Sequence, residues 1–283
     1  MGCTLADTPA PGIFDVLLEC ETGVPRCRLE EEYGAPLLVD GTRVAVNFVS
    51  TIDGIVSFGR DADDSRAVGG GVPADRMLMA MLRAIAGVIV VGAGTLRATR
   101  NHQWTPLALA RDRGEDLVAL RAAAGRPAQP APLLVVSGSG DIPADAIAIS
   151  HPAVPVHVLT SQGSHAVVGG RPGRTHAAPV DAQLSPAAII QAARDLGGGG
   201  TVLCEGGPHL LGILLAGSVP LDLFLTVAPQ LAGRSRDSTE RRSLVEGIAL
   251  PALSRPAGLR SVRRSQDHLL LRYTIDAAKN ERL

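Results

Sequence analysis

The sequence predicts an α/β protein with a mostly parallel central sheet, helices flanking it, and an antiparallel hairpin at the C-terminal end. Short apolar runs alternate with helical segments along the chain, which is the order that builds a parallel sheet. The run at residues 87–91 is apolar throughout, as expected of a strand with both faces covered. The last two strands instead alternate between apolar and polar residues, which is typical of an antiparallel pair.

The elements follow one another regularly along the chain. Strands are expected at residues 44–49, 87–91, 133–136, 156–160, 201–204 and 221–227, with the hairpin at 259–264 and 268–275. Helices are expected from residue 73 to 85, 107 to 124, 185 to 197 and 208 to 215, three of them opening with a proline in the first turn. Residues 13–18 are interpreted as a short helical arm, and residues 163–179 as a surface loop.

This order predicts three parts: an N-terminal extension over residues 1–40, one α/β domain over 41–278, and a tail over 279–283. A chain of 283 residues with 46% hydrophobic residues can bury a sizeable core. The net charge of −1 argues against a general nucleic-acid or membrane-surface partner. No signal-peptide pattern and no membrane-spanning apolar run appears, so we expect a cytoplasmic protein.

The four cysteines do not indicate a metal site. Cys3, Cys20, Cys27 and Cys204 form no CxxC pair, and their spacing matches no zinc-binding pattern. No metal is therefore expected.

Four turns with glycine or hydroxyl residues follow four of the expected strands. They lie at residues 50–54, 92–95, 137–140 and 205–208. Ligands of parallel sheets bind beyond the carboxyl ends of the strands, so these turns predict a binding site at one sheet edge. At the last turn, Gly206 and Gly207 precede Pro208 and a helix, whose free N–H groups suit a phosphate. The alternative is a turn whose glycines only allow tight packing.

Two carboxylates at these turns, Asp53 and Glu205, are the candidate catalytic groups. A buried carboxyl near a heterocycle can donate a proton, or it can hydrogen-bond the amino groups of the ring. Asp53 can equally be a turn former, because Asp-Gly marks a turn. His102 and His209 are alternative proton donors, and Trp104 either stacks on a ring or packs in the core.

Several segments in order resemble the riboflavin-biosynthesis reductase family, the C-terminal domain of the bifunctional deaminase-reductase. They are STIDG at 50–54, LRA at 82–84, VGAGTLR at 91–97, EGGP at 205–208, and Asp222 with Ala228 and Pro229. The resemblance covers residues 42–276. It implies a dihydrofolate-reductase-like fold, NADPH as cofactor, reduction of a ribosyl group on a phosphorylated aminopyrimidine, and a homodimer.

The resemblance also implies roles for individual residues. The residues assigned to the cofactor are Ser50, Gly92, Gly94, Thr95, Ser137, Gly206, Gly207, Pro208, His209, Leu210 and Leu211, with Ser137 near the 2′-phosphate. Ser65, Arg83 and Glu205 are assigned to the substrate, with Arg83 meeting its phosphate. The chain departs from the family at Thr99, where an acidic residue is usual, and over residues 100–104.

The resemblance therefore implies an NADPH-dependent reductase of a pyrimidine- or pterin-like heterocycle, acting on a 5-amino-6-(5-phosphoribosylamino)uracil-type compound by hydride transfer. The alternative is a nucleotide-binding module of the same fold without turnover. A deazaflavin in place of NADPH is a third option.

Overall fold

The computed structural model describes residues 12–59, 64–143, 145–160, 184–235, 240–249 and 255–277. The expected surface loop at 163–179 and the expected tail at 279–283 lie outside the described residues. No helix within the described ranges is long and apolar enough to cross a membrane.

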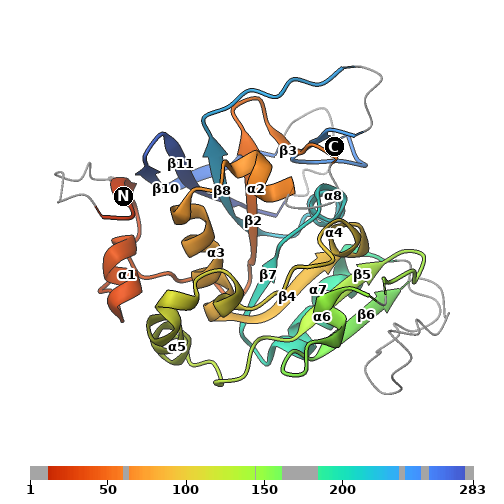
Figure 1. Cartoon of the computed structure of the whole chain (residues 1–283), viewed down its shortest axis with the longest axis horizontal. Coiled ribbons are helices and arrows are strands. Elements are labelled where there is room, and N and C mark those ends of the chain that lie inside the picture. The colour runs from red at the N-terminus through yellow and green to blue at the C-terminus, as the bar shows by residue number, and fades with distance from the viewer. Residues whose placement is uncertain are drawn as a thin grey trace.

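The described residues form one large mixed sheet (Figure 1). Its strands lie in the order β1 (Asp15–Glu19), β10 (Gly258–Ser265), β11 (His268–Ile275), β8 (Leu221–Ala228), β2 (Val44–Thr51), β7 (Thr201–Cys204), β4 (Ala86–Gly92), β5 (Leu133–Ser137) and β6 (Val156–Thr160). From β8 to β6 every neighbouring pair is parallel, whereas β8, β11, β10 and β1 pair antiparallel. The predicted α/β class, with a mostly parallel sheet and a C-terminal hairpin, is confirmed.

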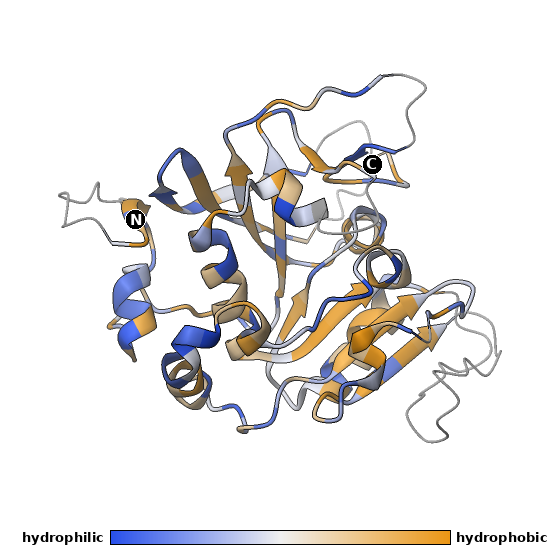
Figure 2. Ribbon diagram, in the orientation of Figure 1, coloured by the Kyte–Doolittle hydropathy of each residue, from blue (hydrophilic) through white to orange (hydrophobic). Residues whose placement is uncertain are grey.

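Helices cover both faces of the parallel part of the sheet. One face packs on α1 (Arg28–Tyr33), α3 (Pro73–Ile85), α5 (Gly114–Ala123) and α6 (Ile147–Ser150), and the other on α7 (Pro186–Gly197) and α8 (Pro208–Ala216). Each face of the sheet carries its own hydrophobic core. In β4 the residues alternate between them, because Ile89 and Val91 pack in the core under the first group of helices, and Val88 and Val90 pack in the core under the second. Figure 2 shows the parallel strands as the most hydrophobic part of the ribbon.

Short elements complete the carboxyl edge of the parallel strands. Helix α4 (Ala93–Ala98) follows β4 directly, and α2 (Asp64–Gly69) precedes α3. A separate two-stranded sheet joins β3 (Ile55–Ser57), just after β2, to β9 (Arg242–Ser243). These elements place side chains above the sheet edge where the predicted turns lie.

The expected helical arm at residues 13–18 is wrong, because this segment forms strand β1. It pairs with β10 in a register that sets Asp15 opposite Arg264 and Glu19 opposite Ser261. The three apolar residues between Asp15 and Glu19 fix no period by themselves, so pairing with a distant strand decides the structure of this segment. Strand β1 also pairs with β10, so β1 and not the C-terminal hairpin forms this edge of the sheet.

The expected helix at 107–124 is shorter than predicted. Two 3₁₀ turns, η1 (Pro106–Ala108) and η2 (Arg111–Arg113), precede α5. The hydroxyl of Thr105 accepts the N–H of Ala108 at 3.3 Å, which closes a turn at the start of this segment. Such a local side-chain bond competes with a continuous helix.

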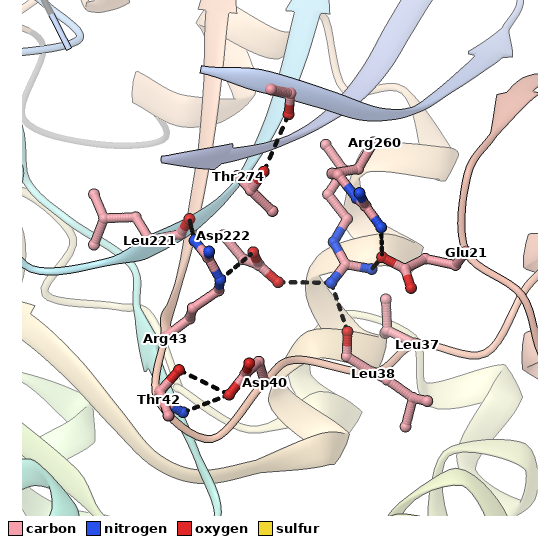
Figure 3. A network of polar contacts seen from close by, with 12 residues as sticks. Glu21, Leu37, Leu38, Asp40, Thr42, Arg43, Leu221, Asp222, Arg260 and Thr274 are labelled. Carbon is pink, nitrogen blue, oxygen red and sulfur yellow. Dashed lines mark hydrogen bonds and ion pairs between the residues drawn. The ribbon is translucent and has the colours of Figure 1, made fainter. Parts of the chain in front are cut away.

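A buried ionic network ties the antiparallel half of the sheet together (Figure 3). Asp222 on β8 accepts a hydrogen bond from Arg272 on β11 at 2.6 Å, and Arg43 lies 4.0 Å from its other oxygen. Arg272 also donates to the carbonyl of Leu38 at 2.6 Å, and it lies 3.8 Å from Glu21. Arg272 thereby links Glu21, before α1, and Leu38, after α1, to the sheet. Part of the expected N-terminal extension is therefore structurally part of the α/β domain. The boundary at residue 40 stays a prediction.

Candidate active site

The four predicted turns follow strands that are neighbours in the sheet. Strand β7 lies between β2 and β4, and β5 lies beside β4, all four running parallel. A cavity of about 380 Å³ opens there. Residues from β2, α2, α3, α4 and α8, and from the turns between them, line this cavity. The turns at residues 92–95 and 205–208 contribute residues to its lining, whereas those at 50–54 and 137–140 do not.

Glycines keep one wall of the cavity free of side chains. The N–H of Gly92 donates to the carbonyl of Gly206 at 2.7 Å, which joins the turns after β4 and β7. A Cβ at Gly94 would meet no protein atom within 4 Å, so a side chain there would occupy the open space. Gly207 begins α8 without a side-chain cap, and His209 and Leu210 in its first turn line the cavity. A backbone without side chains, next to a helix start whose N–H groups have no side-chain cap, is suited to binding a dinucleotide and its phosphate groups.

Arg83 and Glu205 form a buried bidentate ion pair at the floor of the cavity. Arg83 comes from α3, and its Nε and Nη2 donate to the two carboxylate oxygens of Glu205 at 2.7 and 2.6 Å. The Arg83 side chain is 0% exposed and that of Glu205 is 7% exposed. A forked guanidinium fixes both the position and the plane of a carboxylate, so Glu205 is held rigidly beside the cavity.

The remaining N–H groups of Arg83 are also bonded. Its Nη1 donates to the carbonyls of Gln103 at 2.9 Å and Thr105 at 3.3 Å, and its Nη2 lies 2.7 Å from Nε2 of His102. All five donors of the guanidinium are therefore occupied by protein groups. This geometry does not support the expected contact of Arg83 with a substrate phosphate. Arg83 instead positions Glu205 and His102.

Asp75 in the first turn of α3 is a second carboxyl at the cavity, and the sequence interpretation did not select it. It lines the cavity and is only 8% exposed. Burial raises the pKa of Asp75, and the charge of Glu205 adds to this, against lowering contributions from Thr226 and His268. In the sequence, the one feature that points to Asp75 is its position shortly after the glycines at residues 69–71. An Asp in the first turn of a helix usually does no more than stabilise the start of that helix.

Asp53 lies outside the cavity, so the structure does not support its assignment as a catalytic group. Its carboxylate accepts the Thr51 hydroxyl at 2.5 Å and the N–H groups of Ala232 and Gly233 at 3.1 and 2.6 Å. These hydrogen bonds lower the pKa of Asp53 to about 2, and the residue does not line the cavity. The ionised carboxylate of Asp53 stabilises the turn through these hydrogen bonds, in line with the alternative interpretation of Asp53 as a turn former.

The structure brings most of the other predicted residues to the cavity. Those that line it are Ser65, Arg83, Gly92, Gly94, Thr95, Glu205, Gly207, Pro208, His209 and Leu210. Ser50, Ser137, Gly206 and Leu211 do not line it. Ser50 is buried in β2, and the Ser137 hydroxyl accepts the N–H of Gly140 at 3.0 Å. The Leu211 side chain packs in the core, and its N–H donates to the carbonyl of Gly207 at 3.2 Å.

The departures at residues 99–104 also lie at the cavity. Thr99, His102 and Trp104 line it, and the ring of His102 packs edge-on against Trp104 at 4.9 Å between centroids. Within the described ranges, no group of three or more His, Cys, Asp or Glu residues could hold a metal ion.

Comparison with known proteins identifies the family. The model of the RibD C-terminal domain matches residues 42–260. Among solved structures, a pyrimidine reductase-like protein from Corynebacterium diphtheriae superposes with a TM-score of 0.62 at 20% identity, over 88% of this chain and 99% of that one. A search of curated proteins gave no match.

Two further solved structures share the fold. The diaminohydroxyphosphoribosylaminopyrimidine deaminase/5-amino-6-(5-phosphoribosylamino)uracil reductase of Thermotoga maritima superposes with a TM-score of 0.56 at 17% identity, over 83% of this chain and 56% of that one. The riboflavin biosynthesis reductase of Saccharomyces cerevisiae has a TM-score of 0.50 at 13% identity, over 87% and 97%.

The chain shares its fold with the reductase structures described above. It belongs to the RibD C-terminal domain family, a reductase family of riboflavin biosynthesis. The predicted resemblance is confirmed, and with it the dihydrofolate-reductase-like fold that this family implies.

Proposed function

We propose that this protein is an NADPH-dependent reductase of a pyrimidine- or pterin-like heterocycle, with a 5-amino-6-(5-phosphoribosylamino)uracil-type compound as its substrate. The observation that carries the proposal is the shared cavity. It combines an open glycine wall and an uncapped helix start with a rigidly held carboxylate and a buried carboxyl of raised pKa.

The cofactor side of the cavity is formed by Gly92, Gly94 and Thr95 and by the first turn of α8. These residues would hold the dinucleotide, with its phosphates at the N–H groups of α8. When bound, NADPH supplies a hydride to a carbon of the substrate's C=N or C=O group. A preference for NADPH over NADH stays a prediction, because the expected 2′-phosphate residue, Ser137, does not line the cavity.

On the substrate side of the cavity, two carboxyl groups have different roles, one in binding the ring and one in proton transfer. Glu205, held by two hydrogen bonds from Arg83, accepts hydrogen bonds from ring N–H or amino groups. Asp75, whose pKa is raised by burial, donates a proton to the heteroatom of the reduced bond and is reprotonated from solvent. Phe48, Val49 and Trp104 on the cavity walls exclude water.

The deciding experiment is a titration of the protein with NADPH, followed by a heterocycle panel. The proposal predicts saturable NADPH binding and a substrate-dependent loss of the reduced-nicotinamide absorbance. NADPH binding without oxidation across the panel would instead favour the nucleotide-binding module. Turnover with a reduced deazaflavin but not with NADPH would favour the third option.

A homodimer and a cytoplasmic location also remain predictions. The homodimer follows from the family resemblance of the sequence. Light scattering at micromolar concentration should give twice the mass of the 29.2 kDa chain. A monomer mass would contradict it.

A further inference from the structure

Arg242 is a charged side chain at the cavity that the proposed hydride and proton transfers do not use. It lies in β9, where the register sets it opposite Ser57 of β3, and both residues line the cavity. Arg242 is exposed, so it lies where the cavity opens to solvent. A guanidinium does not lose its proton in proteins, so Arg242 brings a permanent positive charge to this opening.

The other ionisable groups at the cavity floor leave little net charge. Arg83 and Glu205 compensate each other through their ion pair. Burial and the charges of nearby arginines lower the pKa of His102 to about 3, so this ring is neutral near neutral pH. Burial raises the pKa of Asp75 and so opposes its ionisation. Among the described residues, no carboxylate pairs with Arg242, which leaves its charge without a counter-ion at the cavity.

A contact with His209 sets the position of the Arg242 guanidinium. Nη1 of Arg242 lies 3.2 Å from Nδ1 of His209, and since a guanidinium has no acceptor, the ring nitrogen accepts. His209 belongs to the first turn of α8 and also lines the cavity. The contact uses one N–H of Arg242, and within the described part of the chain no acceptor is bonded to the others. These N–H groups are available to a ligand.

The chain that follows β9 packs closely against the start of α8. The N–H of Glu246 donates to the carbonyl of Pro208 at 3.3 Å. Gly247 has a φ of +78°, and a Cβ there would lie 2.9 Å from Cδ2 of His209, so only glycine permits this approach. The carboxylate of Glu246 accepts from Nη1 of Arg234 at 3.1 Å, so this acid has a counter-ion of its own. The backbone around β9 is thereby held beside the first turn of α8.

We infer that Arg242 binds the diphosphate of the cofactor. Its charge has no counter-ion at the cavity, and a planar guanidinium can bond a phosphate oxyanion through two parallel N–H groups. Its contact with His209 places it beside the turn of α8 at which the proposed function puts the phosphates. The inference rests on the proposed function for the identity of the ligand as a dinucleotide. It makes Arg242 a binding residue that acts on NADPH and NADH alike, because both carry the diphosphate.

Four ligands test this assignment on Arg242→Gln, which changes an exposed side chain and should fold as the wild type does. NADPH, NADH and ADP-ribose carry the diphosphate, whereas adenosine 2′-monophosphate does not. Titration at low ionic strength should show that the three diphosphate ligands lose affinity by a similar factor of about ten, the effect of losing a hydrogen bond to a charged group. The affinity for adenosine 2′-monophosphate should not change. Added salt should reduce the difference between the variant and the wild type, because exposed charges are screened.

Two further variants separate the charge of Arg242 from other effects of substitution. Arg242→Lys keeps the positive charge, so it should bind ADP-ribose more tightly than Arg242→Gln does. Arg28→Gln removes an arginine of α1 whose side chain is 71% exposed and which lies outside the cavity, so it should bind all four ligands as the wild type does.

Three results would overturn the inference. Folded Arg242→Gln that binds ADP-ribose and both nicotinamide cofactors with wild-type affinity would assign the cation to another ligand, such as a phosphate on the substrate. A loss confined to NADPH and adenosine 2′-monophosphate would assign it to the 2′-phosphate. Arg242→Lys that binds ADP-ribose no better than Arg242→Gln would show that the charge is not what binds.

Failure of the proposed function gives a different result. In that case the wild-type protein binds ADP-ribose and NADPH with the expected dependence on residue 242, yet oxidises no NADPH with any heterocycle. Failure of the inference alone leaves substrate-dependent NADPH oxidation in the wild type, with a cofactor affinity that does not depend on residue 242.

Discussion

At the scale of single residues, the site depends on Arg83 and on the buried carboxyl of Asp75. Arg83 holds the Glu205 carboxylate through two short hydrogen bonds. The same guanidinium contacts Nε2 of His102, and burial together with the charges of Arg83 and Arg76 lowers the pKa of that ring to about 3. Burial raises the pKa of Asp75 and outweighs the lowering contributions of Thr226 and His268. One cation therefore positions two neighbours, and a separate buried carboxyl has a raised pKa.

Replacing Asp75 with asparagine removes the proposed proton donor and keeps the shape of the side chain. We expect turnover to fall by about 10² to 10⁴, the range for loss of a general acid, with NADPH affinity unchanged. The wild-type rate should decline as pH rises through the raised pKa of Asp75, because only the protonated carboxyl donates. A steady-state pH profile checks this. An asparagine variant with the wild-type rate and pH profile would remove Asp75 from the chemistry.

The same variant has a stability consequence of defined sign. A carboxyl whose pKa is raised on folding stabilises the folded state below its unfolded pKa, and this contribution is lost as pH rises through its folded pKa. Asparagine does not titrate. The free energy of unfolding of Asp75→Asn, relative to the wild type, should therefore increase from acidic to neutral pH. A difference that is flat across this range would contradict the raised pKa.

At the scale of elements, the parallel strands and their turns could be predicted, and the segments fixed by distant contacts could not. Strands such as β4 have apolar residues on both faces, so their sequence alone identifies them. Strand β1 depends on pairing with β10, more than 240 residues away, and its own residues predict a helix instead. The same distinction holds for the candidate site. Its glycines could be predicted because they lie in turns that the local sequence identifies, whereas the properties of Asp75 and His102 depend on burial and on the nearby Arg83, which the local sequence does not show.

A substitution at Gly94 tests whether the cofactor binds against the glycine wall between β4 and α4. A Cβ at this position meets no protein atom within 4 Å, so Gly94→Val should fold and yet block the proposed cofactor space. We expect NADPH affinity to fall at least about tenfold, equivalent to roughly 1.4 kcal/mol of binding free energy. Gly41→Val is the matched control, because its Cβ also meets no atom within 4 Å and Gly41 lies outside the cavity. Undiminished NADPH binding by folded Gly94→Val would show that the cofactor lies elsewhere.

At the scale of the whole molecule, the ionic network of Figure 3 joins chain segments from both ends of the sequence. Asp222 on β8 links Arg43, before β2, with Arg272 on β11, and Arg272 lies near Glu21, beyond β1. The antiparallel strands complete the sheet on which the parallel strands and the cavity are built. Removal of one buried partner should therefore weaken the fold without touching the site.

Asp222→Ala leaves the buried Arg272 without its strongest counter-ion. The Asp222 side chain is 1% exposed, and loss of one partner of a buried pair costs about 3–5 kcal/mol. Denaturant unfolding should show this decrease. Asp276→Ala is the control, since Asp276 also pairs with Arg43 but is 82% exposed, and exposed pairs contribute about 0–1 kcal/mol. Equal effects of the two substitutions would refute the structural role given to the network.

The most direct test of the proposed reductase site is a paired measurement on Glu205→Gln, combining NADPH titration with the steady-state rate on the same folded protein. Glutamine keeps the size of the side chain but directs an N–H₂ group toward the donors of Arg83 or of the substrate ring. We predict nearly unchanged NADPH affinity and a turnover lowered at least about tenfold. A variant that loses NADPH binding and keeps its rate at saturating cofactor would place Glu205 in the cofactor site and contradict the account.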